Sequence, residues 1–369
     1  MLQATARQLG ALILGAALCL PLAALAQAPG ASPAPPTTAP TGKVPDNPAR
    51  GMKPADEVST AKGSTAVPGW NNPPASWESA SEKPQYASIP GRETNRLIQG
   101  AGREWRAFHN GPLVQYGGWL VVIVFAAIML FYLVKGSVKL HGRPTGRLIE
   151  RFNAVERTAH WTMAISFVLL ALSGTTILWG KYLILPWLGY GGFSWLTIVA
   201  KNVHNFIGPL FIFSLVVSFL IFVKDNFIHA MDIKWLVKLG GMFGKEEIPS
   251  GRFNGGEKAW FWGGLVLLGA TVSVTGLILD FPNWNQGREL MQQANVVHAI
   301  AAVLFIAGAM AHIYLGTIGM EGAYRAMRDG YVDEEWAREH HALWYEEVKQ
   351  GKRPEKIITG ATQPATGDD

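Results

Sequence analysis

The sequence predicts an all-α integral membrane protein, built from a four-helix bundle and one extra N-terminal transmembrane helix. Of its 369 residues, 49% are hydrophobic and only 16% are charged, which is more apolar than an ordinary soluble domain. Five apolar runs each approach the ~20 residues that a helix needs to cross a bilayer. Four histidines lie inside these runs: His160, His204, His298 and His312.

The first 112 residues are expected to lie outside the bundle. Residues 1–26 hold an apolar run after Arg7 that ends in "ALA", which is typical of a cleaved secretory signal peptide. Residues 27–112 begin rich in Pro, Ala, Ser, Thr and Gly, which predicts a largely disordered periplasmic tether with a short helix in "ETNRLIQGAGREWRAF". Cys19, the one cysteine, would leave with the signal peptide, which excludes cysteine-bound iron–sulfur clusters, disulfides and c-type haem.

The orientation of the five spans follows from the segments between them. The expected spans are residues 113–135, 158–179, 202–223, 260–281 and 294–318. Segments 136–156 and 224–258 are rich in Lys and Arg, whereas 180–200 and 282–293 carry one basic residue each. The positive-inside rule therefore places the basic segments and the tail, residues 320–369, in the cytoplasm, and the mature N-terminus in the periplasm.

Other side chains fit this membrane assignment. The first span carries no charged residue in its interior and is expected to be an added anchor. Six tryptophans near the span ends are expected to be interfacial anchors: Trp161, Trp179, Trp187, Trp260, Trp262 and Trp284. The net charge of +5 is assigned to the cytoplasmic segments, and no nucleic-acid motif accompanies it. The expected partners therefore include membrane lipid and no nucleic acid.

The four intramembrane histidines sort into two pairs by depth. An ionisable residue inside a span indicates a functional site, although an interhelical hydrogen bond is the alternative. Chain direction places His204 and His298 near the periplasmic face, and His160 and His312 near the cytoplasmic face. His298 and His312 are 14 residues apart, which is about 21 Å along one helix and nearly the same helix face. This separation disfavours one zinc site, whose ligands must converge.

Two imidazoles per pair are the axial ligands that suit a six-coordinate haem b. The sequence therefore predicts a four-helix di-haem cytochrome b bundle over residues 157–319, plus one extra N-terminal transmembrane helix. The outer haem iron would be bound by His204 and His298, and the inner one by His160 and His312. Glycines in the spans would permit close approach to a porphyrin or would simply pack helices together: Gly174, Gly208, Gly276 and Gly308.

The residues around these histidines resemble a known family. The segments "RTAHWTM", "NVHNFIGP", "GRFNGGEKAWFW", "VVHAIAAV" and "AHIYLGTIGMEGAYRAMRDGYVDEEWAREHHALWYEEV" together are similar to the membrane cytochrome b, or gamma, subunit of respiratory formate dehydrogenase. The similarity covers roughly residues 150–350 and includes a loop and the tail as well as the histidines. The N-terminal part departs from the short four-helix form of that family.

The resemblance implies a multi-pass subunit of the bacterial inner membrane that works with an iron–sulfur beta subunit and a catalytic alpha subunit containing molybdenum or tungsten. Electrons from external formate oxidation would pass through the outer and inner haems to quinone near the cytoplasmic face. Two alternatives remain. A cytochrome b subunit of a membrane hydrogenase or thiosulfate reductase would have a different electron donor, and a non-redox anchor or transporter would bind no haem.

The resemblance also implies a quinone site at "FNGGEK". Asn254 and the backbone at Gly256 would bond the quinone beside His312, and Glu257, where the family pattern has Gln, would relay a proton. The alternative is a simple turn that opens a helix, with Glu257 favoured by the helix N-terminus. Two basic residues beside His160, Arg151 and Arg157, are expected either to neutralise propionates of the inner haem or to serve the positive-inside pattern.

Overall fold

The structure is a computed structural model that describes residues 85–86, 97–98, 100–241, 248–284 and 286–358. The predicted signal peptide and most of the predicted tether lie outside these described residues. The described part falls into two units, one within Ala26–Ala107 and one within Phe108–Asp369. In the first unit, strand β1 (Gln85–Tyr86) pairs antiparallel with β2 (Leu97–Ile98), and helix α5 (Gly100–Phe108) begins.

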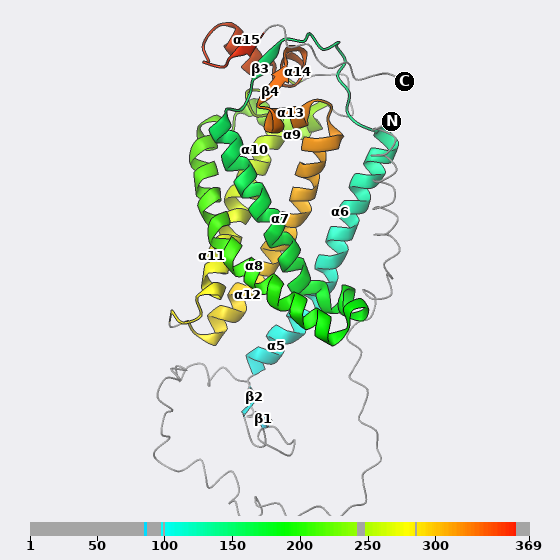
Figure 1. Cartoon of the computed structure of the whole chain (residues 1–369), viewed down its shortest axis with the longest axis vertical. Coiled ribbons are helices and arrows are strands. Elements are labelled where there is room, and N and C mark those ends of the chain that lie inside the picture. The colour runs from blue at the N-terminus through cyan, green and yellow to red at the C-terminus, as the bar shows by residue number, and fades with distance from the viewer. Residues whose placement is uncertain (1–84, 87–96, 99, 242–247, 285, 359–369) are drawn as a thin grey trace, which may run out of the picture. The chain divides into compact units, whose positions relative to one another are not determined.

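Five helices in the described residues are long and apolar enough to cross a membrane, which confirms the all-α membrane fold (Figure 1). These helices extend over Glu104–Lys135, Ala154–Leu183, Leu185–Asp225, Gly255–Asp280 and Arg288–Gly319. Their main parts are α6 (Val114–Lys135), α7 (Ala154–Leu183), α8 (Leu185–Phe222), α10 (Gly255–Ala259) with α11 (Gly269–Asp280), and α12 (Arg288–Tyr314). A π-helical segment, Trp260–Leu268, joins α10 to α11. Each helix is longer than the span predicted from the sequence.

The largest departure from the expected spans is at the start of α8. The sequence predicted residues 180–200 to be a segment between two spans. The structure instead begins α8 at Leu185, where Pro186 occupies the first turn and loses no helical hydrogen bond. Gly189, with φ 64° and ψ 175°, breaks the helix locally, a conformation that only glycine adopts readily. The exposed Trp187 and Tyr190 make this segment apolar on its surface.

The loops and tail at one end of the bundle fold into a compact structure, here called the cap (residues 136–153, 226–241, 248–254 and 320–358). Strand β3 (Leu148–Glu150) lies between β4 (Tyr331–Asp333) and β5 (Ile357–Ile358), and both pairings are antiparallel. Four short helices complete the cap: α9 (Ala230–Val237), α13 (Ala323–Arg328), α14 (Glu334–His340) and α15 (Ala342–Lys349). The segment predicted only as a tail therefore has a fold of its own.

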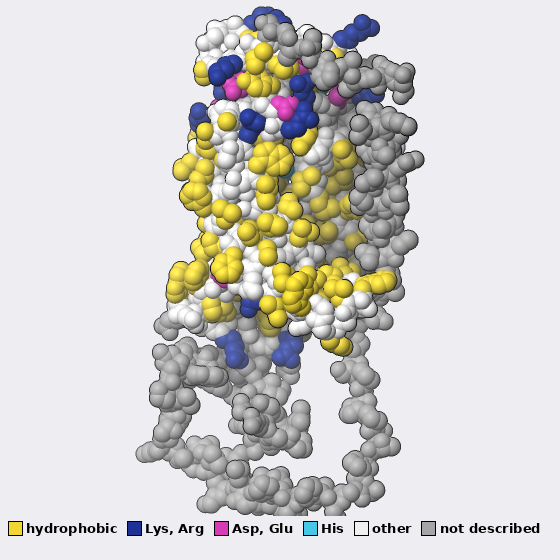
Figure 2. All heavy atoms as spheres, viewed as in Figure 1, with side chains coloured by type: hydrophobic (Ala, Val, Ile, Leu, Met, Phe, Trp, Pro, Cys, Tyr) yellow, Lys and Arg dark blue, Asp and Glu magenta, His cyan; other side chains and the backbone are white. Residues whose placement is uncertain are grey.

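Apolar side chains cover the sides of the bundle, whereas charged ones gather at the cap (Figure 2). Inside the bundle, aromatic rings pack closely, as between Phe167 and Phe305, whose centroids are 4.6 Å apart. The extra helix α6 packs on α12 and α7. Trp179 is only 5% exposed and its Nε1 donates to the Val114 carbonyl, 2.9 Å away. This tryptophan therefore fastens α6 to the bundle, and its prediction as an interfacial anchor is wrong.

Candidate functional site

The structure places the four intramembrane histidines in two pairs. The far-side pair joins His204 of α8 to His298 of α12, with ring centroids 6.0 Å apart. The cap-side pair joins His160 of α7 to His312 of α12, with centroids 6.3 Å apart. Two imidazoles bound to opposite faces of one metal ion, at about 2 Å each, have centroids about 6 Å apart. The spacing in each pair therefore fits one six-coordinate metal between two imidazoles.

Helix α12 contributes one histidine to each pair. His298 and His312 are separated by 14 residues, which corresponds to about 21 Å of helix. The other two ligands come from different helices, because α7 carries His160 near the cap and α8 carries His204 near the far end. No group of three or more His, Cys, Asp and Glu that could hold a metal ion occurs within the described ranges. The histidine geometry is thus that of two separate two-ligand sites.

Each histidine of the far-side pair lies against a hydroxyl and a glycine from the neighbouring helix. Ser173 Oγ lies 2.9 Å from His204 Nδ1. A Cβ added to the adjacent Gly174 would stand 3.3 Å from His204 Cε1. On the other side, Thr275 Oγ1 lies 3.0 Å from His298 Nδ1, and a Cβ on the residue that follows it, Gly276, would stand 3.4 Å from His298 Cε1. The two glycines therefore let both imidazoles approach the helix backbone closely.

The cap-side pair has different neighbours. Nδ1 of His160 is buried and has no hydrogen-bond partner among the described residues. His312 stacks on Trp260, with centroids 5.2 Å apart and planes inclined by 15°. A Cβ on Gly308 or Gly264 would come within 2.6 Å of the Trp260 ring, so both glycines make room for this indole. Trp260 is therefore an internal residue of the site, and its prediction as an interfacial anchor is wrong.

The turn predicted to bind quinone opens the helix that carries Trp260. Asn254 Oδ1 accepts from the Glu257 backbone N–H at 2.9 Å, and Glu257 Oε2 accepts from the Asn254 backbone N–H at 2.9 Å. These two bonds form a capping box. A Cβ on Gly256 would stand 2.7 Å from the Trp235 ring, so no larger residue fits there. Glu257 and Trp260 are three residues apart on one helix face, which brings the turn next to His312.

A second turn of the same kind opens α7. The segments "RFNAVER" (151–157) and "RFNGGEK" (252–258) share their pattern, and Asn153 forms the same capping box with Glu156. The arginines are exchanged between the two turns: Arg151 Nη2 lies 2.8 Å from Glu257, and Arg252 Nη2 lies 2.8 Å from Glu156. The side chain of Glu257 is 33% exposed and that of Glu156 is 8% exposed. Only the second turn therefore leaves its carboxylate accessible.

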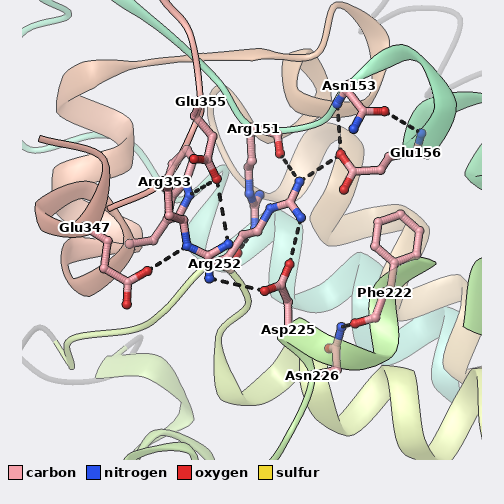
Figure 3. A network of polar contacts seen from close by, with 11 residues as sticks. Arg151, Asn153, Glu156, Phe222, Asp225, Asn226, Arg252, Glu347, Arg353 and Glu355 are labelled. Atoms are coloured by element: carbon pink, nitrogen blue, oxygen red, sulfur yellow. Dashed lines mark hydrogen bonds and ion pairs between the residues drawn. The ribbon is translucent and has the colours of Figure 1, made fainter. Parts of the chain in front are cut away.

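These contacts belong to a buried charge network in the cap (Figure 3). Arg252 lies between Glu156 and Asp225, and Arg353 binds Asp225 from the other side. Burial works to lower the pKa of Arg252, but hydrogen bonds to the two carboxylates outweigh it, so that this pKa is raised. The cap therefore stabilises the charged form of Arg252.

The two arginines beside His160 serve the cap. The Arg151 side chain is 4% exposed, pairs with Glu257 and also donates to the Arg252 carbonyl at 3.0 Å. Burial lowers the pKa of Arg151, and the carboxylate of Glu257 opposes this effect. Arg157 donates to the Arg328 carbonyl at 2.7 Å. These bonds of both arginines are therefore to residues of the cap, and of the two expected roles the contact with haem propionates stays a prediction.

A histidine that directly follows α14 also contacts the second turn. His341 is 1% exposed, and its Nδ1 lies 2.8 Å from the Gly251 carbonyl, so that Nδ1 carries the proton. Its Nε2 lies 4.0 Å from Glu257. Burial first, and then the nearby Arg151, lower the pKa of His341 to about 3. The imidazole is therefore neutral at physiological pH and leaves Arg151 as the cationic partner of Glu257.

Sequence reasoning missed three residues of the site: Ser173, Thr275 and Trp260. A repeated pattern could have found the first two, because a hydroxyl residue followed by glycine stands 20 residues after Asn153 and 21 after Asn254. The one-residue difference coincides with the π-helical segment Trp260–Leu268, and such a segment inserts one residue into a helix. The spacing of these repeated features therefore points to Ser173 and Thr275, which the positions of the histidines alone do not.

Comparison with known proteins identifies relatives of the part of the chain that contains these residues. Residues 151–330 match the family model described as prokaryotic cytochrome b561. The formate dehydrogenase cytochrome b556(fdo) subunit of Escherichia coli K12 is 31% identical over 211 residues, which cover 55% of this chain and 94% of the relative. The nitrate-inducible cytochrome b556(Fdn) subunit of the same strain is 28% identical over 58% of this chain and 98% of the relative.

A third relative comes from another organism. The formate dehydrogenase cytochrome b556 subunit of Haemophilus influenzae is 26% identical over 57% of this chain and 87% of the relative. The matched part includes the four-helix bundle and both histidine pairs. The chain therefore belongs to the prokaryotic cytochrome b561 family, in the group of membrane cytochrome b subunits represented by those of formate dehydrogenase.

Proposed function

We propose that this chain is the electron-transferring membrane subunit of a formate dehydrogenase complex. Each histidine pair would hold one haem b, and the two haems would supply one-electron redox chemistry at two depths of the membrane. The chain would connect an iron–sulfur partner subunit at the far end of the bundle to quinone near the cap. Formate would be oxidised on a catalytic partner subunit containing molybdenum or tungsten.

The observation that carries this proposal is the spacing of the histidine pairs. Centroid separations of 6.0 and 6.3 Å are those expected for two imidazoles on opposite sides of one iron. An ordinary interhelical hydrogen bond would bring two ring nitrogens within about 3.2 Å, and no bond between the two rings of a pair occurs among the described residues. Paired ligation explains why four costly ionisable residues stand inside the spans.

Orientation follows from charge. The cap contains most of the Lys- and Arg-rich segments 136–156 and 224–258, so the positive-inside rule assigns it to the cytoplasm. With five membrane-spanning helices, the mature N-terminus would then lie in the periplasm, where the predicted signal peptide would deliver it. The far-side pair would therefore hold the outer haem, and the cap-side pair the inner haem. The chain would reside in a bacterial inner membrane.

The quinone would bind beside His312, at the turn that contains Asn254, Gly256 and Glu257. Two features of the turn support this binding site. Glu257 is more exposed than its counterpart Glu156, and the backbone N–H of Gly256, in the first helical turn, has no carbonyl partner within the helix. A quinone oxygen could accept from this N–H. Glu257, held by Arg151, could transfer a proton from the cytoplasmic side.

Haem content tests the proposal directly. We expect the purified complex to contain two b-type haems per copy of this chain, measured by pyridine haemochrome spectra and protein quantification. Both haems should be reduced by formate, and added quinone should reoxidise them. A complex with no b-type absorption bands would contradict the proposal and favour a non-redox membrane anchor.

The partner assignment needs a separate measurement. We expect mass spectrometry of the complex, purified under mild detergent, to identify an iron–sulfur subunit and a catalytic subunit that contains molybdenum or tungsten. Co-purification of a nickel–iron subunit would retain the haem sites but assign the chain to a hydrogenase. Membranes from a strain lacking this gene provide the control.

A further inference from the structure

The two histidine pairs differ in the contacts of their imidazole rings. In the far-side pair, both Nδ1 atoms lie against hydroxyl oxygens, Ser173 Oγ at 2.9 Å and Thr275 Oγ1 at 3.0 Å. In the cap-side pair, His160 Nδ1 is buried without a hydrogen-bond partner in the described part of the chain, and His312 contacts the face of Trp260. The hydroxyl contacts therefore belong to one of the two pairs.

The direction of these hydrogen bonds follows from where the hydroxyl protons go. Ser173 Oγ donates to the Leu169 carbonyl at 2.7 Å, and Thr275 Oγ1 donates to the Thr271 carbonyl at 2.6 Å. A hydroxyl has one proton, so each oxygen is left to accept from the imidazole. Both Nδ1 atoms must then carry the proton, and both Nε2 atoms keep their lone pair for a metal.

We propose that Ser173 and Thr275 are positioning residues that orient the outer ligands and lower the reduction potential of the outer haem below that of the inner one. The inference rests on the proposed function and adds to it a cause for the direction of electron flow. A hydrogen bond accepted from Nδ1–H makes the imidazole a stronger electron donor. A stronger donor stabilises ferric iron over ferrous iron, and thereby lowers the potential.

The packing around Ser173 and Thr275 supports their role in positioning the two imidazoles. Gly174 directly follows Ser173 and lies against His204, and Gly276 directly follows Thr275 and lies against His298. A side chain larger than that of glycine would fill the space that each imidazole occupies. The two arrangements come from different helix pairs, α7 with α8 and α11 with α12. Each outer ligand is therefore held in one tautomer and one orientation.

In the described part of the chain, His160 Nδ1 has no hydroxyl partner, and His312 stacks on the Trp260 indole. An imidazole without a partner at Nδ1 is the weaker donor, so the inner haem keeps the higher potential. Electrons would then move downhill from the far end toward the cap, where the proposed quinone turn lies. The asymmetry lies in two hydroxyl groups, and both can be removed without changing the shape of the side chain greatly.

The test is a potentiometric titration of the purified complex that carries Ser173→Ala, Thr275→Val or both. We expect two midpoints in the wild type, the lower one assigned to the outer haem by its loss in His204→Ala. In Thr275→Val the lower midpoint should rise, up to a tenfold change in the reduced-to-oxidised ratio, or about 59 mV for a one-electron couple. The upper midpoint should stay in place. The low-spin ferric electron paramagnetic resonance signal of the outer haem should shift as well.

Two sets of controls separate positioning from packing. Ser166→Ala and Ser273→Ala remove buried hydroxyls on the same two helices. Within the described residues, these hydroxyls donate to the Thr162 and Gly269 carbonyls of their own helix, so both midpoints should be unchanged. Thr275→Ser and Ser173→Thr keep the hydroxyl and should retain the wild-type potential and signal. If Thr275→Val loses the haem, these conservative variants still test the proposal, because they should keep both the haem and its wild-type potential.

Each contrary result has a definite meaning. A shift of the upper midpoint in place of the lower one, or no shift with both haems retained, overturns the positioning role while leaving the two-haem function intact. An equal shift in Thr275→Ser and Thr275→Val also overturns it, because the hydroxyl would then be irrelevant. Absence of two haems in the wild type would instead overturn the proposed function itself.

Discussion

Arg151 and Arg252 each donate a hydrogen bond to the other's backbone carbonyl, with Nη2–O distances of 3.0 and 2.6 Å. Each also pairs with the glutamate of the other's turn, so that the starts of α7 and α10 are locked together reciprocally. Both turns follow the pattern R-F-N-x-x-E, with a capping box in each. This exchange holds the cap to the bundle and places the second turn beside His312.

Replacement of Arg252 by methionine should destabilise the cap strongly. The change removes a cation that contacts Glu156 and Asp225, whose side chains are both 8% exposed, and leaves two buried carboxylates without it. Loss of one partner of a buried ion pair costs about 3–5 kcal/mol. We expect a lower thermal midpoint in detergent and faster proteolysis of the cap. Arg328→Met, at an exposed ion pair, is the control and should change little; equal effects of both variants would contradict the role of the network.

Single histidine variants should separate the two proposed haems. His298→Ala is expected to remove the outer haem and spare the inner one, while His312→Ala should do the reverse, because α12 carries one ligand of each pair. Optical spectra combined with haem stoichiometry measure both outcomes. His160→Ala should have the spectrum of His312→Ala. If it instead lost the same haem as His298→Ala, the assignment of ligands to haems would be wrong.

An added methyl group at Gly174 should weaken the outer haem site while leaving the helix intact. Gly→Ala in a helix interior favours the helix by about 1 kcal/mol, but the new Cβ would stand 3.3 Å from His204 Cε1. We expect Gly174→Ala to reduce outer-haem occupancy, and Gly174→Leu to abolish it, without a fall in thermal stability of the fold. Gly263→Ala, which has no heavy atom within 4 Å of its Cβ, is the matched control. Full outer-haem occupancy in Gly174→Leu would refute the close approach.

The sequence was sufficient to predict the spans and the grouping of the histidines, because both depend on regular helix geometry. The 14 residues between His298 and His312 set a distance and a face without any knowledge of the neighbours. The start of α8 at Leu185 was not predictable in this way. Residues 180–200 were predicted to be a segment between two spans, yet Pro186 stands in a first turn of α8 and Gly189 adopts a positive φ.

The contacts of the site were harder to predict, because they join residues far apart in the chain. Arg151 and Glu257 are 106 positions apart, and no local pattern couples them. Ser173 and Thr275 look like ordinary hydroxyls bonded to their own helix, which is the commoner situation in apolar helices. Trp260 stands where an interfacial anchor is expected, but Gly264 and Gly308 admit it to the interior beside His312. Packing, which the linear pattern does not encode, decides these cases.

The buried His341 should make the cap sensitive to acid. Its pKa is lowered from 6.5 to about 3, so between these values the unfolded chain binds a proton that the folded cap does not. The free energy of unfolding therefore falls as the pH falls from 6.5 toward 3, by up to about 1.4 kcal/mol per pH unit, and is unaffected above 6.5. His341→Asn keeps a donor for the Gly251 carbonyl and does not titrate.

We therefore expect His341→Asn to match the wild type at pH 7.5 and to lose less of its thermal midpoint between pH 6.5 and 4.5. The measurement is a series of thermal scans in detergent across this range. Parallel curves for the two proteins would show that His341 does not couple folding to protonation.

Asn254 has two roles that one pair of substitutions can separate. Asn254→Ala removes the capping oxygen of the second turn, which costs about 1 kcal/mol, and also removes the amide. Asn254→Ser keeps a capping oxygen and removes only the amide. If the amide binds quinone, Asn254→Ser should retain both haems and thermal stability but slow quinone reduction about tenfold, as expected for one lost hydrogen bond.

The matched control for this variant is Asn153→Ser, which makes the same change in the equivalent turn of α7. Formate-dependent haem reduction followed by rapid mixing with quinone measures the step for all three variants. Asn153→Ser should leave the rate of quinone reduction unchanged, because its turn has no exposed glutamate. If Asn153→Ser and Asn254→Ser slow the reaction equally, the effect comes from the cap. If neither variant slows quinone reduction, Asn254 serves only as the helix cap, through its two capping-box hydrogen bonds with Glu257.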